Sequence, residues 1–288
     1  MSNVYILGSG AMGCLWASYL SQYHNVSFIK RRAIGEQYEF TYQPNNKLIR
    51  CMCYDAKTLS RPINRLILAT KAYDALDALK PITHLLAEHT EIVLLQNGLG
   101  SQQEIVKHFP HLTIYACSST EGAYKPDEHT LVHAGHGLNK IGALTQSANF
   151  QSLQSWIPNQ FILWQDSIEA ILWQKFMINC AINPLTVIYQ CANGQLLKNS
   201  DYHQHLKKIC VEIDIITTAK GYQLTSAYEL ARKVCEVTAE NFSSMLQDAR
   251  NHRHTEIEYM TGYLLKESAR LKLECPNNQT LYSAIQQA

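Results

Sequence analysis

The sequence feature that most constrains the fold is a glycine pattern close to the N-terminus. An apolar stretch at residues 4–7 runs directly into Gly8, further glycines follow at Gly10 and Gly13, and residues 14–20 are mostly apolar. This order predicts a buried strand, a tight turn and a helix, which together form the phosphate-binding loop of dinucleotide folds. An ordinary glycine turn is the alternative, but the flanking strand and helix favour the dinucleotide interpretation.

Each glycine of this loop has a different predicted task. Gly8 permits the turn, Gly10 lets the backbone approach the pyrophosphate without a Cβ atom, and Gly13 lets the helix pack closely on the strand. The start of the helix offers N–H groups and the positive end of the helix dipole to an anion. The predicted cofactor-binding residues of the loop are Gly8, Ser9, Gly10, Ala11, Met12 and Gly13.

The end of the second predicted strand, residues 25–29, indicates which dinucleotide binds. In this fold an Asp or Glu near that point accepts hydrogen bonds from the ribose 2′-hydroxyl of NAD. Lys30, Arg31 and Arg32 stand there instead. Because positive charge favours a 2′-phosphate, the sequence predicts NADP rather than NAD. A solvated basic turn is the alternative.

Two further apolar stretches, at residues 66–70 and 92–95, are typical of parallel strands that are covered on both faces. Lys71 directly follows the first stretch, and Asn97 closely follows the second. Ligands of open α/β sheets bind at the carboxyl ends of the strands. We therefore expect both side chains at the same edge as the glycine loop.

The order of the predicted elements divides the chain into two domains. Further strands are predicted at residues 48–53 and 112–117, antiparallel strands that close the sheet at 130–133 and 139–143, and helices at 72–79, 102–109, 167–188, 201–220, 225–249 and 255–271. Alternating strands and helices followed by helices alone indicate an α/β fold with a Rossmann-type dinucleotide-binding domain at residues 1–165. An all-α substrate domain is predicted at residues 166–288.

Composition excludes several classes of protein. The formal net charge of +1 does not favour a nucleic-acid or anionic-membrane partner, and neither a signal peptide nor a membrane span is indicated. The nine cysteines form no CxxC pair, which is typical of reduced, buried thiols in a cytoplasmic protein. The close histidine pairs, such as His133 with His136, have no Cys or acidic residue at metal-ligand spacing, so no metal site is predicted.

The second half opens with three polar residues at helical spacing in an apolar segment. Lys175, Asn179 and Asn183 are four apart, so they share one helix face. Burying a lysine and two amides without partners costs several kcal/mol, so solvent, another segment or a ligand must satisfy them. A lysine that extends to solvent beside structural amides is the alternative to a site.

A second polar group lies near residues 241–259. Thr255 could cap a helix whose first turn holds Glu256 and Glu258. From spacing alone, capping is the favoured interpretation of these acids.

At this point the chain resembles a known family, the ketopantoate reductases (2-dehydropantoate 2-reductases). The resemblance covers nearly the whole chain in the right order. The motifs that carry it are GSGAMG, TKA, QNG, LWQKFMINCAINPLT, CANGQL, AENFSSMLQDARNHRHTEIEYMTGYLL and CPNN. INPLT and HTEIEY are much more specific than the glycine loop.

The resemblance implies NADPH-dependent reduction of 2-dehydropantoate to (R)-pantoate, in the pathway to pantothenate and coenzyme A. It implies that Lys175 is the general acid and that Glu256 helps to place substrate and cofactor. The substrate-binding positions that it implies are Asn97, Asn179, Asn183, Asn193 and Ser244, and the cofactor-binding positions beyond the loop are Arg31, Lys71, Asn97, Ala123 and Glu256. Arg31 is expected to face the 2′-phosphate.

Elementary chemistry agrees with these roles. Hydride addition builds negative charge on the carbonyl oxygen, which an ammonium group can stabilise and then protonate. Two alternatives are a reductase of another branched 2-oxo acid and a non-catalytic NADP-binding sensor, which we would expect to lack Lys175 or Glu256. A cytoplasmic monomer or homodimer is expected.

Overall fold

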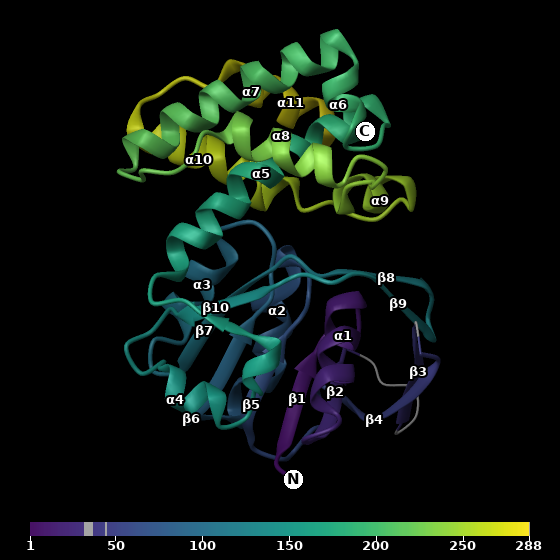
Figure 1. Cartoon of the computed structure of the whole chain (residues 1–288). Helices are drawn as coiled ribbons and strands as arrows, with labels where there is room; N and C mark the ends of the chain where they lie inside the picture. The colour runs from purple at the N-terminus through teal and green to yellow at the C-terminus, as the bar shows by residue number, and fades with distance from the viewer. Residues whose placement is uncertain (32–36, 44, 288) are drawn as a thin grey trace. The chain divides into compact units, whose positions relative to one another are not determined.

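The computed structural model describes residues 1–31, 37–43 and 45–287. The chain forms two compact units. Unit 1 comprises Met1–Gln96 and Ser101–Ile168, and unit 2 comprises Asn97–Gly100 and Glu169–Ala288. Unit 1 is built on a sheet and unit 2 is helical, which confirms the predicted fold class (Figure 1). The predicted boundary after residue 165 stays a prediction.

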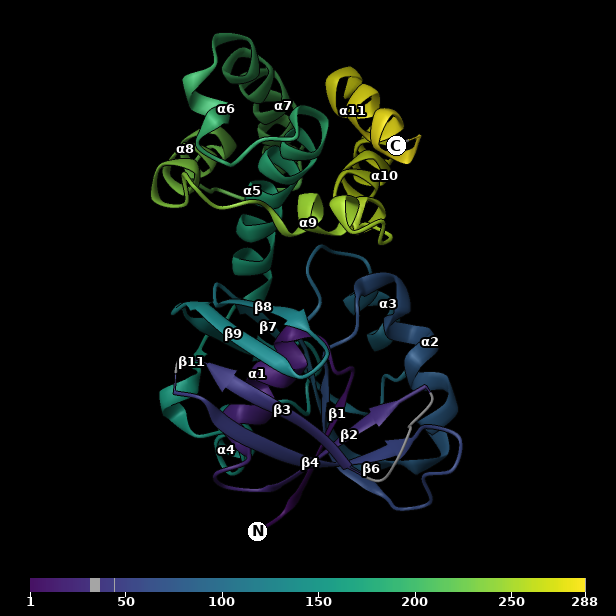
Figure 2. The same cartoon turned by 90° about the vertical axis from the view of Figure 1, so that its right-hand side faces the viewer.

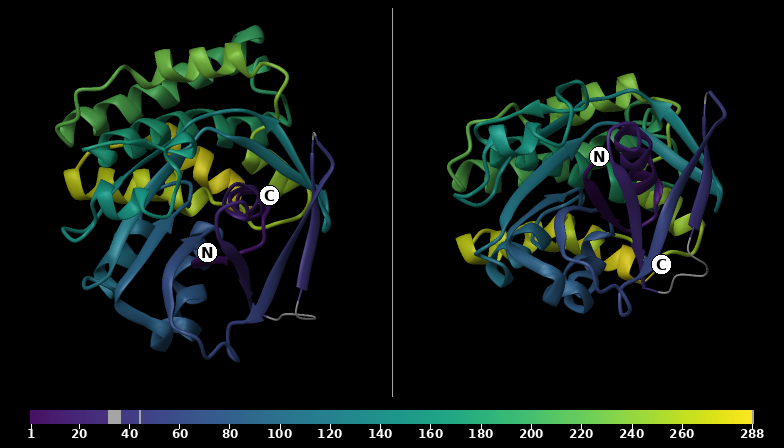
Figure 3. Two further views of the ribbon diagram at one scale, coloured as in Figure 1. Left: turned by 60° about the horizontal axis from the view of Figure 1, so that its bottom comes forward. Right: turned by 90° about the horizontal axis from the view of Figure 1, so that it is seen from below.

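Unit 1 contains an 11-stranded sheet with the strand order β11-β10-β7-β6-β5-β1-β2-β4-β3-β9-β8. The strands are β1 (Asn3–Leu7), β2 (Asn25–Lys30), β3 (Gln37–Gln43), β4 (Lys47–Asp55), β5 (Ile63–Leu68), β6 (Leu86–Leu94), β7 (Thr113–Ser119), β8 (Gly122–Asp127), β9 (Thr130–Gly135), β10 (Asn139–Ala143) and β11 (Leu163–Trp164). From β7 across β1 to β4, all neighbouring strands run parallel. Figure 3 shows β3 and β4 as a long indigo ribbon at one side of unit 1.

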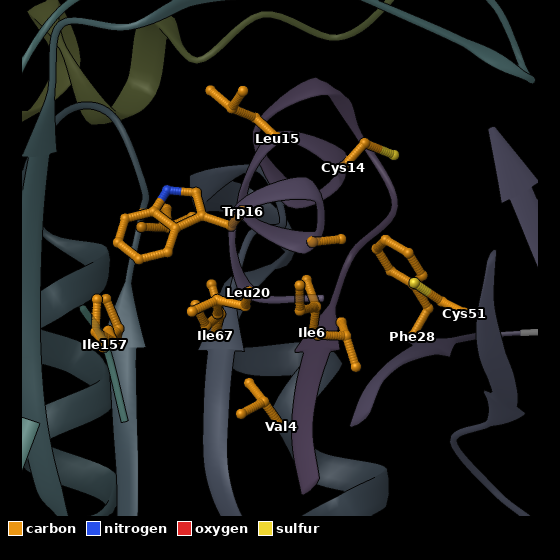
Figure 4. Packing of buried hydrophobic residues seen from close by; sticks show 14 of the residues in the cluster. Val4, Ile6, Cys14, Leu15, Trp16, Leu20, Phe28, Cys51, Ile67 and Ile157 are labelled. Atoms are coloured by element: carbon orange, nitrogen blue, oxygen red, sulfur yellow. The ribbon is translucent and has the colours of Figure 1, made fainter. Parts of the chain in front are cut away.

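The central parallel strands β1, β2, β5 and β6 each contain a run of buried, mostly apolar residues, because both faces of the sheet are covered there. Ile6 belongs to one hydrophobic cluster, with Trp16 of the helix α1 (Ala11–Leu20). Its neighbour Leu7 belongs to the other cluster, with residues of α2 (Ala75–Leu79) and α3 (Ser101–His108). Figure 4 shows the first cluster, in which side chains of β1, β2 and β5 lie beneath α1. Alternation along the strands thus buries successive side chains on opposite faces.

Short helical segments complete unit 1. They are η1 (Ala72–Asp74), η2 (Lys80–Leu85), α4 (Phe150–Gln154) and η3 (Asn159–Phe161). The helix predicted at residues 72–79 is therefore a 3₁₀ turn followed by α2, and a second 3₁₀ segment continues through Pro81. The helix predicted at 102–109 is confirmed as α3.

The two segments predicted as antiparallel strands join the sheet at opposite ends. β10 pairs antiparallel with β7, as expected. β9 pairs antiparallel with β8, but its other neighbour is β3, and that pairing is parallel. Figure 2 shows β8 and β9 beside β3. The prediction of two antiparallel strands is confirmed, but the parallel pairing of β9 with β3 was not predicted, because alternation shows that a segment is a strand but not which neighbour it joins.

Unit 2 contains the remaining helices. They are α5 (Ile168–Tyr189), α6 (Gln195–Lys198), α7 (Ser200–Ala219), α8 (Ala227–Val237), α9 (Ser244–Arg250), η4 (Ile257–Tyr259), α10 (Thr261–Leu271) and α11 (Pro276–Gln286). The helices predicted at 167–188 and 201–220 are confirmed, whereas α6 and α11 were not predicted. No helix among the residues that the structure describes is long and apolar enough to cross a bilayer.

The helix predicted at residues 225–249 is interrupted between α8 and α9 because its carbonyls have tertiary partners. The Asn193 N–H donates to Asn241 O at 3.0 Å, and the Gly194 N–H donates to Ala239 O at 3.0 Å. The loop before α6 thus uses acceptors that a continuous helix would pair internally.

The helix predicted at residues 255–271 is also broken. It starts as the 3₁₀ turn η4, and α10 follows it after Met260. Glu256, and not Thr255, occupies the N-cap position of η4, and no side-chain cap bond forms there. The predicted capping role of Thr255 was therefore wrong.

The late CPNN motif has a structural explanation within unit 2. The buried Glu212 carboxylate of α7 accepts hydrogen bonds from the backbone N–H groups of Asn277 and Asn278, at 2.9 Å each. It also accepts from both side-chain amides, at 2.6 and 2.7 Å. Four donors compensate the cost of burying the charge and tie the start of α11 to α7.

Candidate functional site

The glycine loop adopts the geometry that its three predicted tasks require. Gly8 has φ +109°, and a Cβ atom there would lie 2.9 Å from the backbone of Ala69. A Cβ atom at Gly13 would lie 2.1 Å from the Gly8 carbonyl oxygen, so only glycine allows this approach of helix and strand. A Cβ atom at Gly10 would meet nothing within 4 Å, so the space outside the turn is open.

The start of α1 is suited to an anion. Gly10 is its N-cap, makes no side-chain cap bond, and no acidic residue lies in the first turn. The first N–H groups of a helix lack partners within the helix and form the positive end of its dipole. These features, with the open space at Gly10, fit the pyrophosphate of a dinucleotide.

The glycine loop lies where the strand order reverses. β1 has β2 on one side and β5 on the other, although β5 comes later in the chain than β3 and β4. The Ala69 N–H donates to Leu7 O at 2.9 Å, which joins the carboxyl ends of β1 and β5. Lys71 follows and precedes η1. Such a reversal is the usual ligand-binding point of open α/β sheets.

A lysine that was not predicted also contacts the glycine loop. Lys125 Nζ, on β8, donates to the Ser9 carbonyl oxygen at 3.3 Å and to Tyr38 Oη at 2.5 Å. Burial lowers the pKa of Lys125, and the neighbouring Lys30 adds to that effect. Ala123, a predicted cofactor residue, lies on the same strand and packs against the cluster that contains Cys14. No local sequence signal links β8 to a loop so far away in the chain.

The basic segment at the end of β2 has protein partners in part. The Arg31 guanidinium pairs with the Asp74 carboxylate of η1, and 68% of the Arg31 side chain is exposed. Lys30 Nζ lies 3.7 Å from the centre of the Tyr38 ring. Arg32 lies outside the described residues. The structure thus places an acid beside Arg31 that the local sequence did not reveal.

In unit 2 the structure brings two predicted site residues into direct contact. Lys175 Nζ donates a hydrogen bond to Asn97 Oδ1 at 2.8 Å, although the residues are 78 apart in the chain. Both side chains are half-buried, as is that of Asn179 one turn further along α5. Asn97 is a neutral amide, so this contact does not cancel the positive charge of the lysine.

The turn that carries Asn97 is held by the segment that follows Glu256. The Leu99 N–H donates to Tyr259 O at 2.8 Å. Gly98 has φ +78°, and a Cβ atom there would lie 2.2 Å from the same oxygen. Glu256 is 4% exposed and precedes η4, which ends at Tyr259. The QNG motif is therefore built to fit the HTEIEY motif.

The other end of the α5 face contacts the same region. Asn183 is buried, and its Nδ2 lies 3.8 Å from Met260 Sδ. A thioether is a weak acceptor, so this amide has a poor partner. Three segments of unit 2, residues 97–100, 175–183 and 256–260, therefore meet.

The remaining predicted substrate residues have different surroundings. Asn193 is buried, and its Nδ2 donates to Thr238 Oγ1 at 2.9 Å, which ties it to the break between α8 and α9. Ser244 is exposed as the first residue of α9. Its neighbour Ser243 is buried, caps α9 and lies 2.7 Å from Thr186 Oγ1. Two adjacent serines thus have opposite surroundings, one buried and one exposed, that the sequence does not distinguish.

A hollow of about 240 Å³ at the amino ends of β1 and β5 is lined by Asn3, Tyr5 and Asn64, among others. It lies at the other end of these strands from Gly8 and Ala69. Because ligands of this fold bind at the carboxyl ends, the hollow does not bear on the candidate site.

Comparison with known proteins gives matches over almost the whole chain. Residues 4–146 match the family model "Ketopantoate reductase PanE/ApbA", and residues 167–288 match "Ketopantoate reductase PanE/ApbA C terminal". The 2-dehydropantoate 2-reductase of Yersinia pestis is 31% identical over 302 residues, covering 98% of this chain and 94% of that protein.

Solved structures agree on the fold. A probable 2-dehydropantoate 2-reductase from Bacillus subtilis is 27% identical, with a TM-score of 0.83 over 99% of each chain. A D-mandelate dehydrogenase solved with NADH and anilino(oxo)acetate has a TM-score of 0.87 at 23% identity, over 100% of this chain and 98% of that one. At that identity the likeness concerns the fold alone. From its two family-model matches and its full-length relative, this chain belongs to the ketopantoate reductase family, as an NAD(P)-dependent 2-oxo-acid reductase.

Proposed function

We propose that this protein reduces the ketone of 2-dehydropantoate (ketopantoate) to (R)-pantoate with NADPH, as a step of pantothenate and coenzyme A biosynthesis. The observation that carries the proposal is the hydrogen bond from Lys175 Nζ to Asn97 Oδ1. It joins the expected proton donor to a residue expected to contact both substrate and cofactor, in a chain of this family.

NADPH supplies the hydride when bound. Its pyrophosphate would be held by the loop Gly8–Gly13 and the uncapped start of α1, since the open space at Gly10 leaves room for it. Lys71 and Ala123 would contribute further contacts at this sheet edge. Lys125 was not predicted, but its contact with the Ser9 carbonyl supports a part in holding the loop and in attracting the phosphates.

Arg31 would bind the 2′-phosphate and so select NADPH. Its guanidinium is exposed and is paired with Asp74 through an ion pair that a dianionic phosphate can compete with. A phosphate can accept two parallel hydrogen bonds from an arginine, as a carboxylate does. Asp74 therefore moderates the preference for NADPH without removing it.

Lys175 would donate the proton. As hydride reaches the carbonyl carbon, negative charge develops on the oxygen, and the ammonium stabilises that charge and then protonates it. Asn97 Oδ1 accepts one of the three ammonium hydrogens at 2.8 Å, which orients the group. A neutral amide is suited to this task because a carboxylate in its place would neutralise the lysine.

The substrate would be held by amides and a hydroxyl. Asn179 and Asn183 lie one and two turns beyond Lys175 on α5, and the Nδ2 of Asn183 can exchange its weak thioether contact for a substrate oxygen. The exposed Ser244 hydroxyl would donate to the substrate carboxylate, and Asn193 would add a further contact. Glu256 is proposed to help position substrate and cofactor.

The setting proposed for this activity is the cytoplasm, with the protein as a monomer or homodimer. All nine cysteines are free thiols, and eight of them are buried. Reduced thiols fit a reducing compartment.

The test is NADPH oxidation, followed by the nicotinamide absorbance, with ketopantoate, other branched 2-oxo acids and phenylglyoxylate as substrates. We expect the highest kcat/KM for ketopantoate and a higher kcat/KM with NADPH than with NADH. A higher kcat/KM for another branched or aromatic 2-oxo acid would replace the proposed substrate. NADPH binding without turnover of any of these acids would favour the sensor.

A further inference from the structure

We propose that Glu121, His133 and His136 form a binding site for one divalent transition-metal ion of the zinc class, on the β8–β9 hairpin of unit 1. One ligand atom from each of the three lies within 4.8 Å of the others. None of the three is a predicted site residue, and the sequence argued against a metal there.

The strand pairing assembles the site. Glu121 directly precedes β8, His133 lies on β9, and His136 directly follows β9. Gly122 is the register partner of Gly135, which brings the two ends of the hairpin together. The acidic partner missing at local spacing is therefore supplied across the hairpin, twelve positions before His133.

The separations suit two imidazoles and a carboxylate around one ion. Zinc bonds of about 2.1 Å in a tetrahedron put ligand atoms about 3.4 Å apart. His133 Nε2 and Glu121 Oε2 are 2.8 Å apart, and the full set lies within 4.8 Å. Side-chain movements of about 1 Å would therefore complete the geometry. Nitrogen and carboxylate ligands favour zinc, cobalt or nickel over calcium or magnesium.

The groups around the ligands are those that metal sites use to orient them. His133 Nδ1 lies 2.8 Å from Tyr42 Oη. The Glu121 carboxylate accepts from Tyr19 Oη at 3.0 Å and from the Gly137 N–H at 2.9 Å. A ligand histidine normally uses its other ring nitrogen in such a hydrogen bond, and ligand carboxylates are hydrogen-bonded in turn.

Metal binding requires a proton to move. His133 Nε2 shares a proton with Glu121 Oε2 at 2.8 Å, and the ion needs the lone pair of that nitrogen. In a neutral imidazole the proton transfers to Nδ1, whose N–H then donates to Tyr42 Oη. In a charged imidazole Nδ1 already carries a proton, and the one on Nε2 leaves to solvent.

One side of the site is open. The side chains of His133 and Glu121 are 1% and 8% exposed, whereas His136 is exposed. The ring of His136 lies 4.3 Å from that of His133, centre to centre. His136 thus gives an ion access, and water can fill the fourth position.

The test is zinc binding to untagged protein, by competition with a fluorescent chelator. We expect one equivalent to bind the unmodified chain, and at least a tenfold loss of affinity in His136→Ala, because one of three protein ligands is gone. His111→Ala is the matched control, since His111 is also exposed and lies outside the cluster, and its affinity should be unchanged. Equal affinity in both variants, or no binding by the unmodified chain, would overturn the proposal in favour of a purely structural hydrogen-bond network.

Two further readouts separate this site from the thiols and from misfolding. Cobalt bound here should give visible bands without the near-ultraviolet thiolate charge-transfer band. Zinc should raise the thermal unfolding midpoint of the unmodified chain and of His111→Ala, but not of His136→Ala. A thiolate band, or equal zinc stabilisation of all three proteins, would contradict the assignment to Glu121, His133 and His136.

Discussion

The glycine loop of unit 1 and the polar face of α5 in unit 2 are assembled in different ways. The turn of the loop depends mainly on residues close in the chain, because Gly13 approaches the Gly8 carbonyl oxygen within a single turn, although Ala69 also packs against Gly8. The α5 face depends on remote segments, since Asn97 reaches Lys175 and Tyr259 fixes the turn that carries Asn97. One added Cβ atom is therefore expected to disrupt the glycine loop, whereas the α5 face is expected to be disrupted when a residue that contacts it from another segment is replaced.

The largest expected effect on activity is at Lys175, the residue on which the proposed role of the α5 face depends. Lys175→Met removes the proposed proton donor, so kcat should fall about 10²- to 10⁴-fold. NADPH affinity, measured by fluorescence titration, should be unchanged.

The matched control is Lys208→Met, at an exposed position of α7, which should behave as the unmodified protein. Normal kcat in Lys175→Met, with weakened NADPH binding, would remove the catalytic role.

The loop offers a contrast between two neighbouring glycines. Gly13→Ala forces a methyl group against the Gly8 carbonyl oxygen, 2.1 Å away, and should lower the free energy of unfolding by about 1–3 kcal/mol. Gly10→Ala meets open space, so denaturant unfolding should change by less than about 1 kcal/mol. Its NADPH affinity should nevertheless drop, because the methyl group occupies space that the pyrophosphate needs. Unchanged NADPH affinity in Gly10→Ala would contradict the proposed phosphate approach.

Changing the amide partner of Lys175 tests whether its neutrality matters. Asn97→Ala removes the hydrogen bond that Asn97 Oδ1 accepts from the ammonium and should lower kcat about 10²-fold. Asn97→Asp places a carboxylate beside the ammonium, which raises the pKa of Lys175. Because the protonated lysine is the active form, activity is lost as pH rises through that pKa, and the basic limb of the kcat profile should move to higher pH. An unmoved limb in Asn97→Asp would mean that Lys175 does not control it.

The smallest effects are expected at the exposed ion pair. Arg31→Ala should raise the KM for NADPH about tenfold, the equivalent of one hydrogen bond to a charged group, and leave the KM for NADH nearly unchanged. Asp74→Asn frees the guanidinium and should lower the KM for NADPH about two- to threefold, the value of an exposed ion pair. Equal changes for NADPH and NADH in Arg31→Ala would rule out the 2′-phosphate contact.

Local sequence patterns predicted much of this fold. Continuous apolar strands, the glycine spacing and the helical spacing of Lys175, Asn179 and Asn183 depend only on neighbours in the chain, and the corresponding elements are present. The errors occur where remote contacts compete with local propensity. The helix predicted at 225–249 is broken because residues 193 and 194 take its carbonyls, and the one predicted at 255–271 is broken where Tyr259 O accepts from Leu99.

The candidate site divides in the same way. The glycine loop and the polar face of α5 could be proposed from local patterns, but not the contact of Lys125 with Ser9 or the pairing of Arg31 with Asp74. The group of Glu121, His133 and His136 shows most clearly why such contacts cannot be predicted from the sequence. Histidine spacing in the chain revealed no acidic partner for His133 and His136, and strand register supplied Glu121.

The sequence by itself determined the order of an α/β unit and a helical unit, a loop fit for a pyrophosphate, and a lysine in line with two amides. Backbone conformation and periodicity are properties of neighbouring residues, so they can be read from the chain. Only the tertiary structure decided that Asn97 belongs with Lys175, that Asp74 meets Arg31, and that Glu121 joins two histidines. Such pairs form when distant segments pack together, and the energy that selects them is shared over many contacts that no single stretch of the chain contains.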